Sequence, residues 1–281
     1  MSPSTLTGGH KAGLAQTLRA DSWWTGPALT ATILLGFITY STWAAFQANH
    51  YWVDGGAEGF GGYLSPFYSP VLLVDTQAEG SVPAHHSWFG EKPDWWPSSL
   101  PFSPAFLILA FPGAFRFTCY YYRKAYYRTF TGTPPGCSVG AVPQKKYKGE
   151  TSFLIFQNLH RYALYFAIAF IFILSWDAFQ SYFRGGKIGI GVGSVVLTLN
   201  VVFLSCYTFG CHSYRHLIGG KMNRFSGCAI VQTRHRAWQG CSWLNTRHML
   251  FAWVSLFGVA LTDVYVRLVS MNVIKDFNTW N

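Results

Sequence analysis

The feature that most constrains this sequence is a series of long, mostly apolar runs. Five of them approach or exceed the roughly 20 residues that a helix needs to cross a membrane. They cover about 26–48, 104–128, 152–182, 188–214 and 249–273. The first run is uncharged and too long for the apolar part of a signal peptide. We therefore expect an all-α membrane protein, with residues 1–281 forming one transmembrane domain built as a bundle of five transmembrane helices.

The composition excludes two other classes of protein. Only 11% of the residues are charged, against about 25% in soluble globular proteins. The aromatic content of 19% excludes a disordered chain. The formal net charge of +10 would suggest nucleic acid as the partner of a soluble protein, but in a membrane protein it follows from cytoplasmic loop charge. We therefore expect neither a soluble enzyme nor a nucleic-acid partner.

The distribution of Lys and Arg predicts the orientation, because cytoplasmic loops carry the excess of these residues. Fourteen lie on the side of the amino terminus: Lys11, Arg19, Arg123, Lys124, Arg128, Lys145, Lys146, Lys148, Arg215, Lys221, Arg224, Arg234, Arg236 and Arg247. The opposite side has four: Lys92, Arg184, Lys187 and Lys275. We expect a multi-pass plasma-membrane protein with a cytoplasmic amino terminus and an external carboxyl terminus.

This orientation also assigns the connections between the runs. Loops 129–150 and 215–248 are then cytoplasmic, and loop 49–100 is external. The external loop is long and rich in Gly, Pro and Trp, which indicates a folded cap. All six cysteines fall toward the cytoplasmic side, so a disulfide framework is not expected.

Ionisable residues inside the runs are candidates for function, because each is costly to hold in hydrocarbon. A helical rise of 1.5 Å per residue places Cys119, His160, Cys211 and His212 at similar depths toward the cytoplasmic side. His216 follows His212 by one helical turn. His248 opens the fifth run at a similar depth. Two thiols and at least two imidazoles can therefore meet inside one bundle.

Two redox centres use such a set of side chains. A b-type haem takes two His from different helices, whereas a Rieske-type [2Fe-2S] cluster takes two Cys and two His. The cluster also accounts for the thiols. A structural zinc ion would use the same ligand types but has no evident purpose in a membrane bundle, so it ranks third.

Simpler explanations remain open for each of these residues. A lone Cys in a helix is commonly a small packing residue, and a His at a helix end commonly reaches into the headgroup region. Cys206 lies about 140° around the helix from Cys211, so the two thiols are not expected to share a partner. Cys137, Cys228 and Cys241 have no CxxC spacing and are expected to be ordinary reduced thiols.

Two further features also have simple interpretations. Asp263 and Arg267, four residues apart, are expected to form a neutralising intramembrane ion pair. The aromatic residues fit belts at both membrane interfaces. Tyr and basic residues alternate over Tyr120–Arg128, which also suits a landing surface for a soluble partner on the cytoplasmic face.

Four strings in the sequence resemble a known family. They are FRFTCYYYRKAYYR at Phe115–Arg128, NLHRY at Asn158–Tyr162, YTFGCHSYRHLIGG at Tyr207–Gly220 and LTDVYVRL at Leu261–Leu268. Together they resemble the membrane anchor of the actinobacterial type-F succinate dehydrogenases, the mycobacterial members in particular. The resemblance extends over all five runs, and the two Cys-containing strings are long enough to be specific.

The resemblance implies a respiratory complex II with a soluble flavoprotein subunit, a soluble iron–sulfur subunit and this single anchor. In that family the anchor is described as lacking haem and holding a Rieske-type cluster beside a quinone site. Carried over, Cys119 and Cys211 are the thiolate ligands, and His160 and His212 are the imidazole ligands, with His216 in reserve. The pair Arg215–His216 resembles the Arg-His pair near haem propionates or quinone in ordinary complex II anchors.

The expected function follows from this resemblance. The chain would pass electrons from the soluble iron–sulfur subunit, docked on the cytoplasmic face, to a membrane quinone, with menaquinone expected of an actinobacterial source. It would be an enzyme only as the quinone-reducing anchor, because succinate oxidation belongs to a partner subunit. Arg116 and Arg161 are placed beside the ligands, where positive charge stabilises reduced states. The alternatives are a haem b anchor of the same complex and a non-redox membrane scaffold or transporter.

Overall fold

The computed structural model describes residues 13–55, 62–97, 102–142, 153–220, 222–223 and 227–280. Lys11, Lys145, Lys146, Lys148, Lys221 and Arg224, which contributed to the predicted orientation, lie outside these residues. Contacts divide the chain into two units, Met1–Ile38 with Phe117–Leu159, and Thr39–Arg116 with His160–Asn281. We call them the first unit and the second unit, and each is described by itself.

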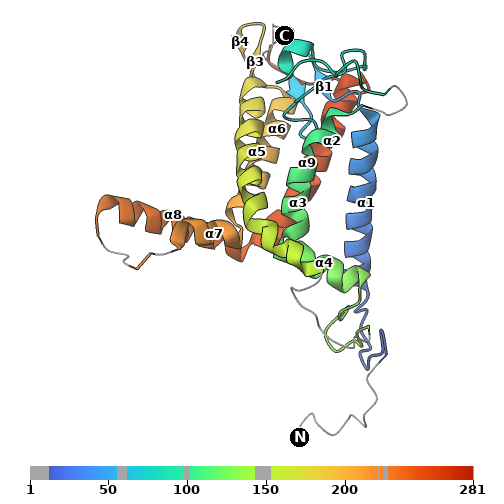
Figure 1. Cartoon of the computed structure of the whole chain (residues 1–281), viewed down its shortest axis with the longest axis vertical. Helices are drawn as coiled ribbons and strands as arrows, with labels where there is room; N and C mark the ends of the chain where they lie inside the picture. The colour runs from blue at the N-terminus through green and yellow to red at the C-terminus, as the bar shows by residue number, and fades with distance from the viewer. Residues whose placement is uncertain are drawn as a thin grey trace, which may run out of the picture. The chain divides into compact units, whose positions relative to one another are not determined.

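The described residues are mainly helical (Figure 1). The α-helices are α1 Thr25–Gln47, α2 Pro104–Ile108, α3 Ala110–Thr118, α4 Tyr120–Phe130, α5 His160–Gln180, α6 Val192–Phe209, α7 His212–Gly219, α8 Ala229–Thr246 and α9 His248–Ser270. Two 3-10 helices are η2 Ala84–His86 and η4 Phe153–Leu159. The strands form two short antiparallel hairpins, β1 Trp52–Val53 with β2 Tyr63–Leu64, and β3 Phe183–Arg184 with β4 Lys187–Ile188.

Four of the five predicted spans are helices long and apolar enough to cross a membrane: Thr25–Gln47, Phe156–Gln180, Val192–Phe209 and His248–Ser270. By their length and composition, these four helices in the described part of the chain support an all-α, multi-pass membrane protein. The fourth span ends at Phe209, five residues before the predicted boundary at 214, because the chain breaks at Gly210 and Cys211 before α7 begins.

The prediction of one continuous helix over 104–128 is wrong. Breaks at Leu109 and Cys119 divide this segment into α2, α3 and α4. Pro112 gives a reason for the first break, because proline has no N–H to donate to the carbonyl of Ile108 and its ring clashes there. At Cys119 the backbone is extended, with φ −66° and ψ 134°.

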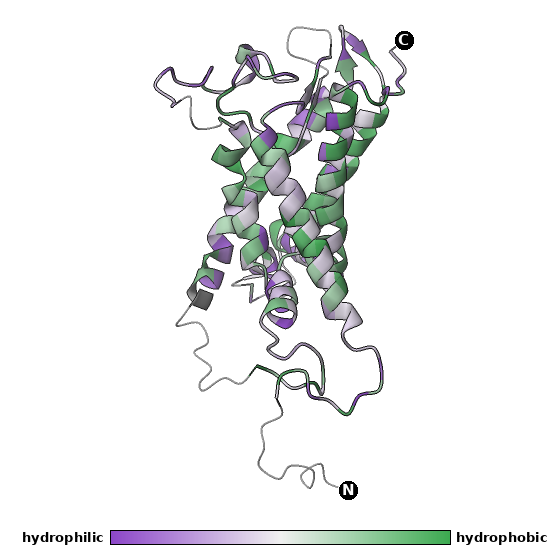
Figure 2. Cartoon of the chain, turned by 90° about the vertical axis from the view of Figure 1, so that its right-hand side faces the viewer, coloured by the Kyte–Doolittle hydropathy of each residue, from purple (hydrophilic) through white to green (hydrophobic). Residues whose placement is uncertain are grey.

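In the second unit, α6 packs along α5 and α9. The buried core between them includes Ala178, Leu197 and Val266, and Tyr63 of the cap packs against the same cluster. Gly193 allows this close approach, because a Cβ atom there would overlap the Tyr63 ring. Large apolar side chains such as Phe172 and Leu261 are exposed on the same helices, as expected of lipid-facing positions. Figure 2 shows that hydrophobic residues predominate along the long helices.

The described part of the loop between α1 and α2 folds into a cap, and three carboxylates fasten it to the helices and the carboxyl-terminal segment of the second unit. Asp263 accepts hydrogen bonds from Ser65 and from Tyr40, the latter at 2.5 Å. Asp276 accepts hydrogen bonds from Tyr63 and Tyr265, each at 2.7 Å. Further contacts are Ser69 with Asp177, Gly193 N–H with Asp276 at 3.0 Å, Arg184 near Asp276 at 3.9 Å, and the ion pair between Asp263 and Arg267 at 3.6 Å. The predicted intramembrane ion pair is confirmed.

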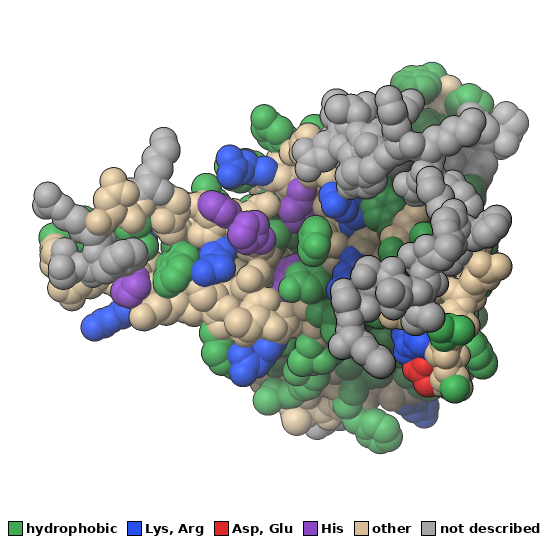
Figure 3. Space-filling view, turned by 90° about the horizontal axis from the view of Figure 1, so that it is seen from below, with side chains coloured by type: hydrophobic (Ala, Val, Ile, Leu, Met, Phe, Trp, Pro, Cys, Tyr) green, Lys and Arg blue, Asp and Glu red, His purple; other side chains and the backbone are tan. Residues whose placement is uncertain are grey.

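At the opposite end of the second unit, α7 and α8 form an arm that leaves the helices sideways (Figure 1). The arm carries exposed apolar residues such as Ile230 and Trp243 beside its basic residues. Histidine and arginine side chains gather on the face of the arm seen in Figure 3. No acidic residue occurs anywhere between Asp177 and Asp263 in the sequence.

The first unit contains α4 and the segments that contact it. Tyr126 stacks on Phe117 with ring centroids 5.7 Å apart, and its hydroxyl accepts a hydrogen bond from Gln157 at 2.8 Å. Arg19 pairs with Asp21 and donates to the carbonyl of Cys137 at 2.9 Å. Tyr120 remains 65% exposed. The predicted landing surface along α4 is therefore a partly exposed, basic and aromatic helix.

Candidate functional site

The centre of the candidate site is a direct contact between two predicted ligands. The Nε2 atom of His160 lies 3.0 Å from the Sγ atom of Cys211. His160 is the first residue of α5, and Cys211 stands at the amino-terminal cap of α7. The fold thus brings together two residues that are 51 positions apart in the sequence and were predicted to lie at similar depth.

The break between α6 and α7 fixes the position of Cys211. Its backbone is extended, with φ −66° and ψ 141°, and its carbonyl accepts the N–H of Arg215 at 3.0 Å. Asn245 of α8 donates to the carbonyl of Gly210 at 2.8 Å. A Cβ atom on Gly210 would lie 2.7 Å from the carbonyl oxygen of Cys206, so only glycine fits. The thiol is therefore held by two helices besides its own.

An aromatic ring fixes the orientation of the His160 imidazole. Phe115 stacks on it with a centroid distance of 4.8 Å and an interplanar angle of 8°. The imidazole also forms a hydrogen bond with the Phe115 backbone. A histidine that ligates a metal is commonly oriented by a hydrogen bond of this kind to a backbone carbonyl. His160 is therefore preorganised in the way a ligand requires.

A second histidine, His248, is held in a matching way. It is the first residue of α9, it is 2% exposed, and Tyr207 stacks on it at 4.9 Å with an interplanar angle of 14°. Tyr207 meets Phe115 edge-on at 5.4 Å. The two imidazoles thus flank a pair of aromatic rings.

Arg116 lies beside this aromatic pair. Its guanidinium donates to the carbonyl of Ala252 at 3.4 Å and to Ser255 Oγ at 3.1 Å, and it stands 4.9 Å from the centre of the Tyr207 ring. A cation above a tyrosine ring is attracted by the negative face of the ring. Arg116 therefore brings a positive charge to the site. Arg161, in contrast, has an exposed side chain.

Cys119 belongs to the first unit, where it is buried and precedes α4. Its local conformation repeats that of Cys211, because each thiol stands at the cap of a helix with nearly the same φ and ψ. His160 follows Cys119 after 41 positions and His248 follows Cys211 after 37, and each imidazole opens a long helix. The sequence therefore contains two similar thiol–imidazole pairs.

His212 and His216 lie on the arm rather than at this buried position. Both side chains are exposed, and their ring centroids are 4.7 Å apart. Burial lowers the pKa of His212, and the neighbouring His216 and Arg215 lower it further. They line a cavity of about 260 Å³ with Arg215, Gly219, Gly220 and Trp238. The guanidinium of Arg215 covers the Trp238 ring at 4.9 Å.

Of the residues proposed from the sequence, the structure brings His160 and Cys211 into contact, places His212 and His216 on the arm, and buries His248 in the same aromatic cluster. The similar spacing of the two thiol–imidazole pairs is the sequence signal that could have drawn attention to His248. In the described part of the chain, no three His, Cys, Asp or Glu side chains are grouped as a metal site. The donor chemistry still fits a soft metal centre, since a buried thiol and oriented imidazoles are the ligands that iron–sulfur clusters and zinc prefer.

These features define a class of protein: a multi-pass membrane protein with thiol and imidazole donors preorganised among its helices. A family model described as actinobacterial succinate dehydrogenase subunit SdhC matches residues 25–272. The chain belongs to this family, so it is a membrane-anchor subunit of an actinobacterial succinate dehydrogenase. The family inferred from the sequence is confirmed.

One solved structure supports this assignment. The chain is similar to a chain of the Mycobacterium smegmatis Sdh1 complex in the apo form, with 40% identity and a TM-score of 0.82. The match covers 100% of this chain and 98% of the other. No curated protein matches the chain.

Proposed function

We propose that this membrane anchor transfers electrons from a docked soluble iron–sulfur subunit to a membrane quinone. The single observation that carries the proposal is the 3.0 Å contact between His160 Nε2 and Cys211 Sγ. A thiol–imidazole contact fixed by backbone and aromatic neighbours has no evident packing purpose in a lipid-facing helix bundle. The flavoprotein and iron–sulfur subunits of succinate dehydrogenase are the proposed partners, and α4 and the basic arm offer them positively charged surfaces.

The proposed cofactor is a Rieske-type [2Fe-2S] cluster. When bound, such a cluster accepts and donates one electron at a potential raised by its imidazole ligands. Cys211 and His160 would hold it, and Cys119 is the second thiolate that the sequence supplies. For the second imidazole, burial and aromatic stacking favour His248 over the predicted His212, whose side chain is exposed.

The residues around the donors would tune the cluster and exclude water from it. Phe115 and Tyr207 cover the imidazole faces, and both are buried. The Arg116 guanidinium would stabilise a more negative reduced state through its positive charge. These side chains thus provide a low-dielectric environment with one fixed cation.

The proposed quinone site is the cavity of about 260 Å³ lined by His212, Arg215 and His216. It begins one residue after Cys211, and its polar side chains can donate hydrogen bonds to quinone carbonyl oxygens. Trp238 offers an aromatic face to the quinone ring. Menaquinone is the acceptor expected of an actinobacterial family.

The test is low-temperature EPR and an optical spectrum of the reduced, purified complex. We expect the low average g value of a His-ligated [2Fe-2S] cluster, lost in Cys211→Ser and retained in the matched thiol control Cys206→Ser. A strong haem Soret band without this signal would instead establish a haem b anchor. Absence of both would leave a scaffold without a redox centre.

A paired comparison decides between the two candidate imidazoles. We expect His248→Ala to abolish the EPR signal and to lower the iron content by about two atoms, the cluster's complement. His212→Ala should retain the signal and raise the KM for quinone. The reverse pattern would restore His212 as the ligand.

A further inference from the structure

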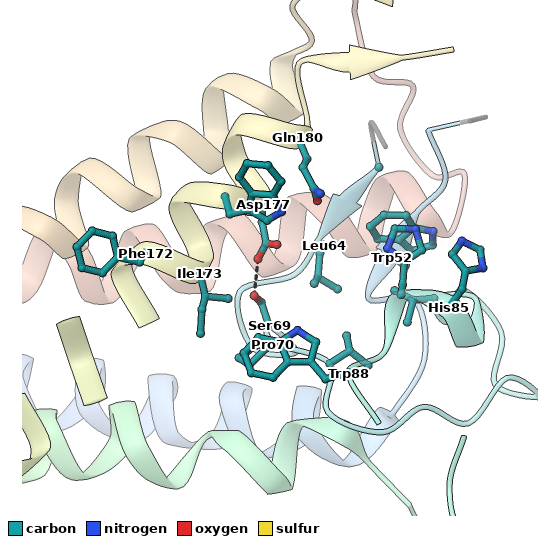
Figure 4. Close-up of a pocket in the computed structure, with 15 residues that line it drawn as sticks. Trp52, Leu64, Ser69, Pro70, His85, Trp88, Phe172, Ile173, Asp177 and Gln180 are labelled. Atoms are coloured by element: carbon teal, nitrogen blue, oxygen red, sulfur yellow. Dashed lines mark hydrogen bonds between the residues drawn. The ribbon is translucent and has the colours of Figure 1, made fainter. Parts of the chain in front are cut away.

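A second cavity, of about 520 Å³, lies between the cap and the end of α5 that faces it (Figure 4). The cap contributes Trp52, Ser69 and Trp88, and α5 contributes Trp176 and Asp177. Asp177 lies 17 residues after His160, or about 25 Å along the helix. This cavity is therefore separate from the thiol–imidazole site.

Asp177 differs from the other two carboxylates that hold the cap. Asp263 pairs with Arg267, and Asp276 has Arg184 at 3.9 Å. Among the described residues, the structure gives Asp177 a hydrogen bond from Ser69 but no ion pair. A carboxylate in a membrane span is costly unless it meets a cation or a proton. The polar end of the cavity therefore favours a cationic ligand.

The lining carries no compensating charge. It contains neither Lys nor Arg, although the chain has a formal net charge of +10. Two histidines, His85 and His86, are also part of it. Burial lowers the pKa of His86, and the adjacent His85 lowers it further, which opposes a positive charge on this imidazole. The charge that a ligand meets there is that of the Asp177 carboxylate.

The remaining walls are apolar and reach the lipid-facing surface of α5. Phe172 and Trp176 line the cavity and are 68% and 54% exposed. On a membrane-spanning helix such side chains face hydrocarbon, so the cavity opens toward the bilayer. Trp52, Trp88 and Trp176 also line the cavity, and indole is the aromatic ring that attracts cations most strongly. The cavity thus combines a negative group, aromatic faces and access from lipid.

We propose that this cavity binds an amphiphile with a protonated primary amine, namely the headgroup of an aminophospholipid in the leaflet at the cap end. The ammonium group would contact Asp177 beside Ser69, and an acyl chain would lie along Phe172 and Trp176. A lipid held there would join the cap to α5. This site is independent of the proposed electron transfer.

The test uses the intact complex in nanodiscs that contain phosphatidylethanolamine and phosphatidylglycerol with identical acyl chains. Native mass spectrometry then counts the lipids that remain bound. We expect retained phosphatidylethanolamine, reduced about tenfold or more in Asp177→Asn, because a charge-assisted contact of this kind contributes at least that factor. Ser69→Ala keeps the carboxylate and should retain the preference. Asp75→Asn removes a cap carboxylate outside the cavity and is the matched control.

Three results separate the possible occupants. Equal retention of phosphatidylethanolamine in Asp177→Asn and in the unmodified complex would overturn the proposal, as would equal retention of both lipids. Displacement of the lipid by a neutral menaquinone analogue as readily as by dodecylamine would also overturn it. A third outcome is that the complex retains no lipid but binds dodecylamine, and not dodecanol, in a way that depends on Asp177. This result would support recognition of an amine and would identify the ligand as a free amine. A variant complex that elutes normally in size exclusion confirms that Asp177→Asn has folded.

Discussion

The buried ion pair of α9 gives a prediction that the structure makes quantitative. Asp263 is fully buried and Arg267 is 5% exposed, and their closest charged atoms are 3.6 Å apart. In the variant Asp263→Asn, the Arg267 guanidinium loses the carboxylate that neutralises it. It retains its hydrogen bond to the carbonyl of Asn49 at 2.9 Å and its contact with the Trp43 ring at 5.2 Å. Removing one partner of a buried pair costs about 3–5 kcal/mol.

For a unit of about 200 residues, each kcal/mol corresponds to about 2–4 °C in unfolding temperature. Asp263→Asn and Arg267→Met should therefore each lower it by about 6–20 °C. The double variant should lose less than the sum of the two single variants, because neither charge is then buried alone. The unfolding temperatures of the two single variants and the double variant can be measured by size exclusion of the heated complex, with a fluorescent tag on this chain.

The control is an exposed pair in the cap, Asp75 with Lys92, whose side chains are 20% and 40% exposed. Exposed ion pairs contribute less than about 1 kcal/mol, so Asp75→Asn should shift the unfolding temperature by under about 4 °C. Additive losses in the Asp263 and Arg267 double variant would refute the reasoning. So would an Asp263→Asn shift no larger than that of the control.

Three further predictions concern the donors and the cap. The variant Gly210→Val should lower the iron content of the purified complex, because the valine side chain would collide with the Cys206 carbonyl. The control variant Gly113→Val should retain the iron, because a Cβ atom at position 113 meets nothing within 4 Å. Arg116→Leu should lower the midpoint potential in an EPR redox titration, and Arg116→Lys should keep most of the native value. Burial and the Asp276 carboxylate raise the pKa of Tyr63 to about 12. The protonated Tyr63 hydroxyl therefore contributes fully to the free energy of unfolding below pH 10, and this contribution is lost as the pH rises through 12. The variant Tyr63→Phe should lack this pH-dependent loss of stability in unfolding measurements.

Hydropathy located the helices that lipid surrounds, because the physical requirement on them is local. The runs 26–48 and 249–273 correspond to Thr25–Gln47 and His248–Ser270 within a few residues. The run 104–128 fails because two breaks interrupt it, at Leu109 and at Cys119. Pro112 could have predicted the first break from the sequence. The second break, at the extended backbone of Cys119, has neither a proline nor a glycine to mark it in the sequence.

Counting residues at 1.5 Å each predicted that His160 and Cys211 lie at similar depth, and the structure places them in contact. The placement of the other imidazoles depends on helix rotation and on where the chain bends. Continuing α6 past Cys211 would have kept His212 inside the bundle, but the break at Gly210 sends it onto the arm. A basic residue at a helix start is commonly interfacial, and only packing against Tyr207 shows that His248 is buried.

The placement of acidic residues bears on the cluster proposed for this end of the second unit. Between Asp177 and Asp263 the sequence has no carboxylate, and the acids that flank this segment contact the cap instead. The side chains near α7 and the first turn of α9 include thiol and imidazole groups, which suit a soft metal better than the oxygen-coordinated ions Mg²⁺ and Ca²⁺. Carboxylates there would oppose the reduction of the proposed cluster through their negative charge, whereas the Arg116 charge would favour it. Separating carboxylates from soft donors would therefore serve both the cap and the proposed redox centre.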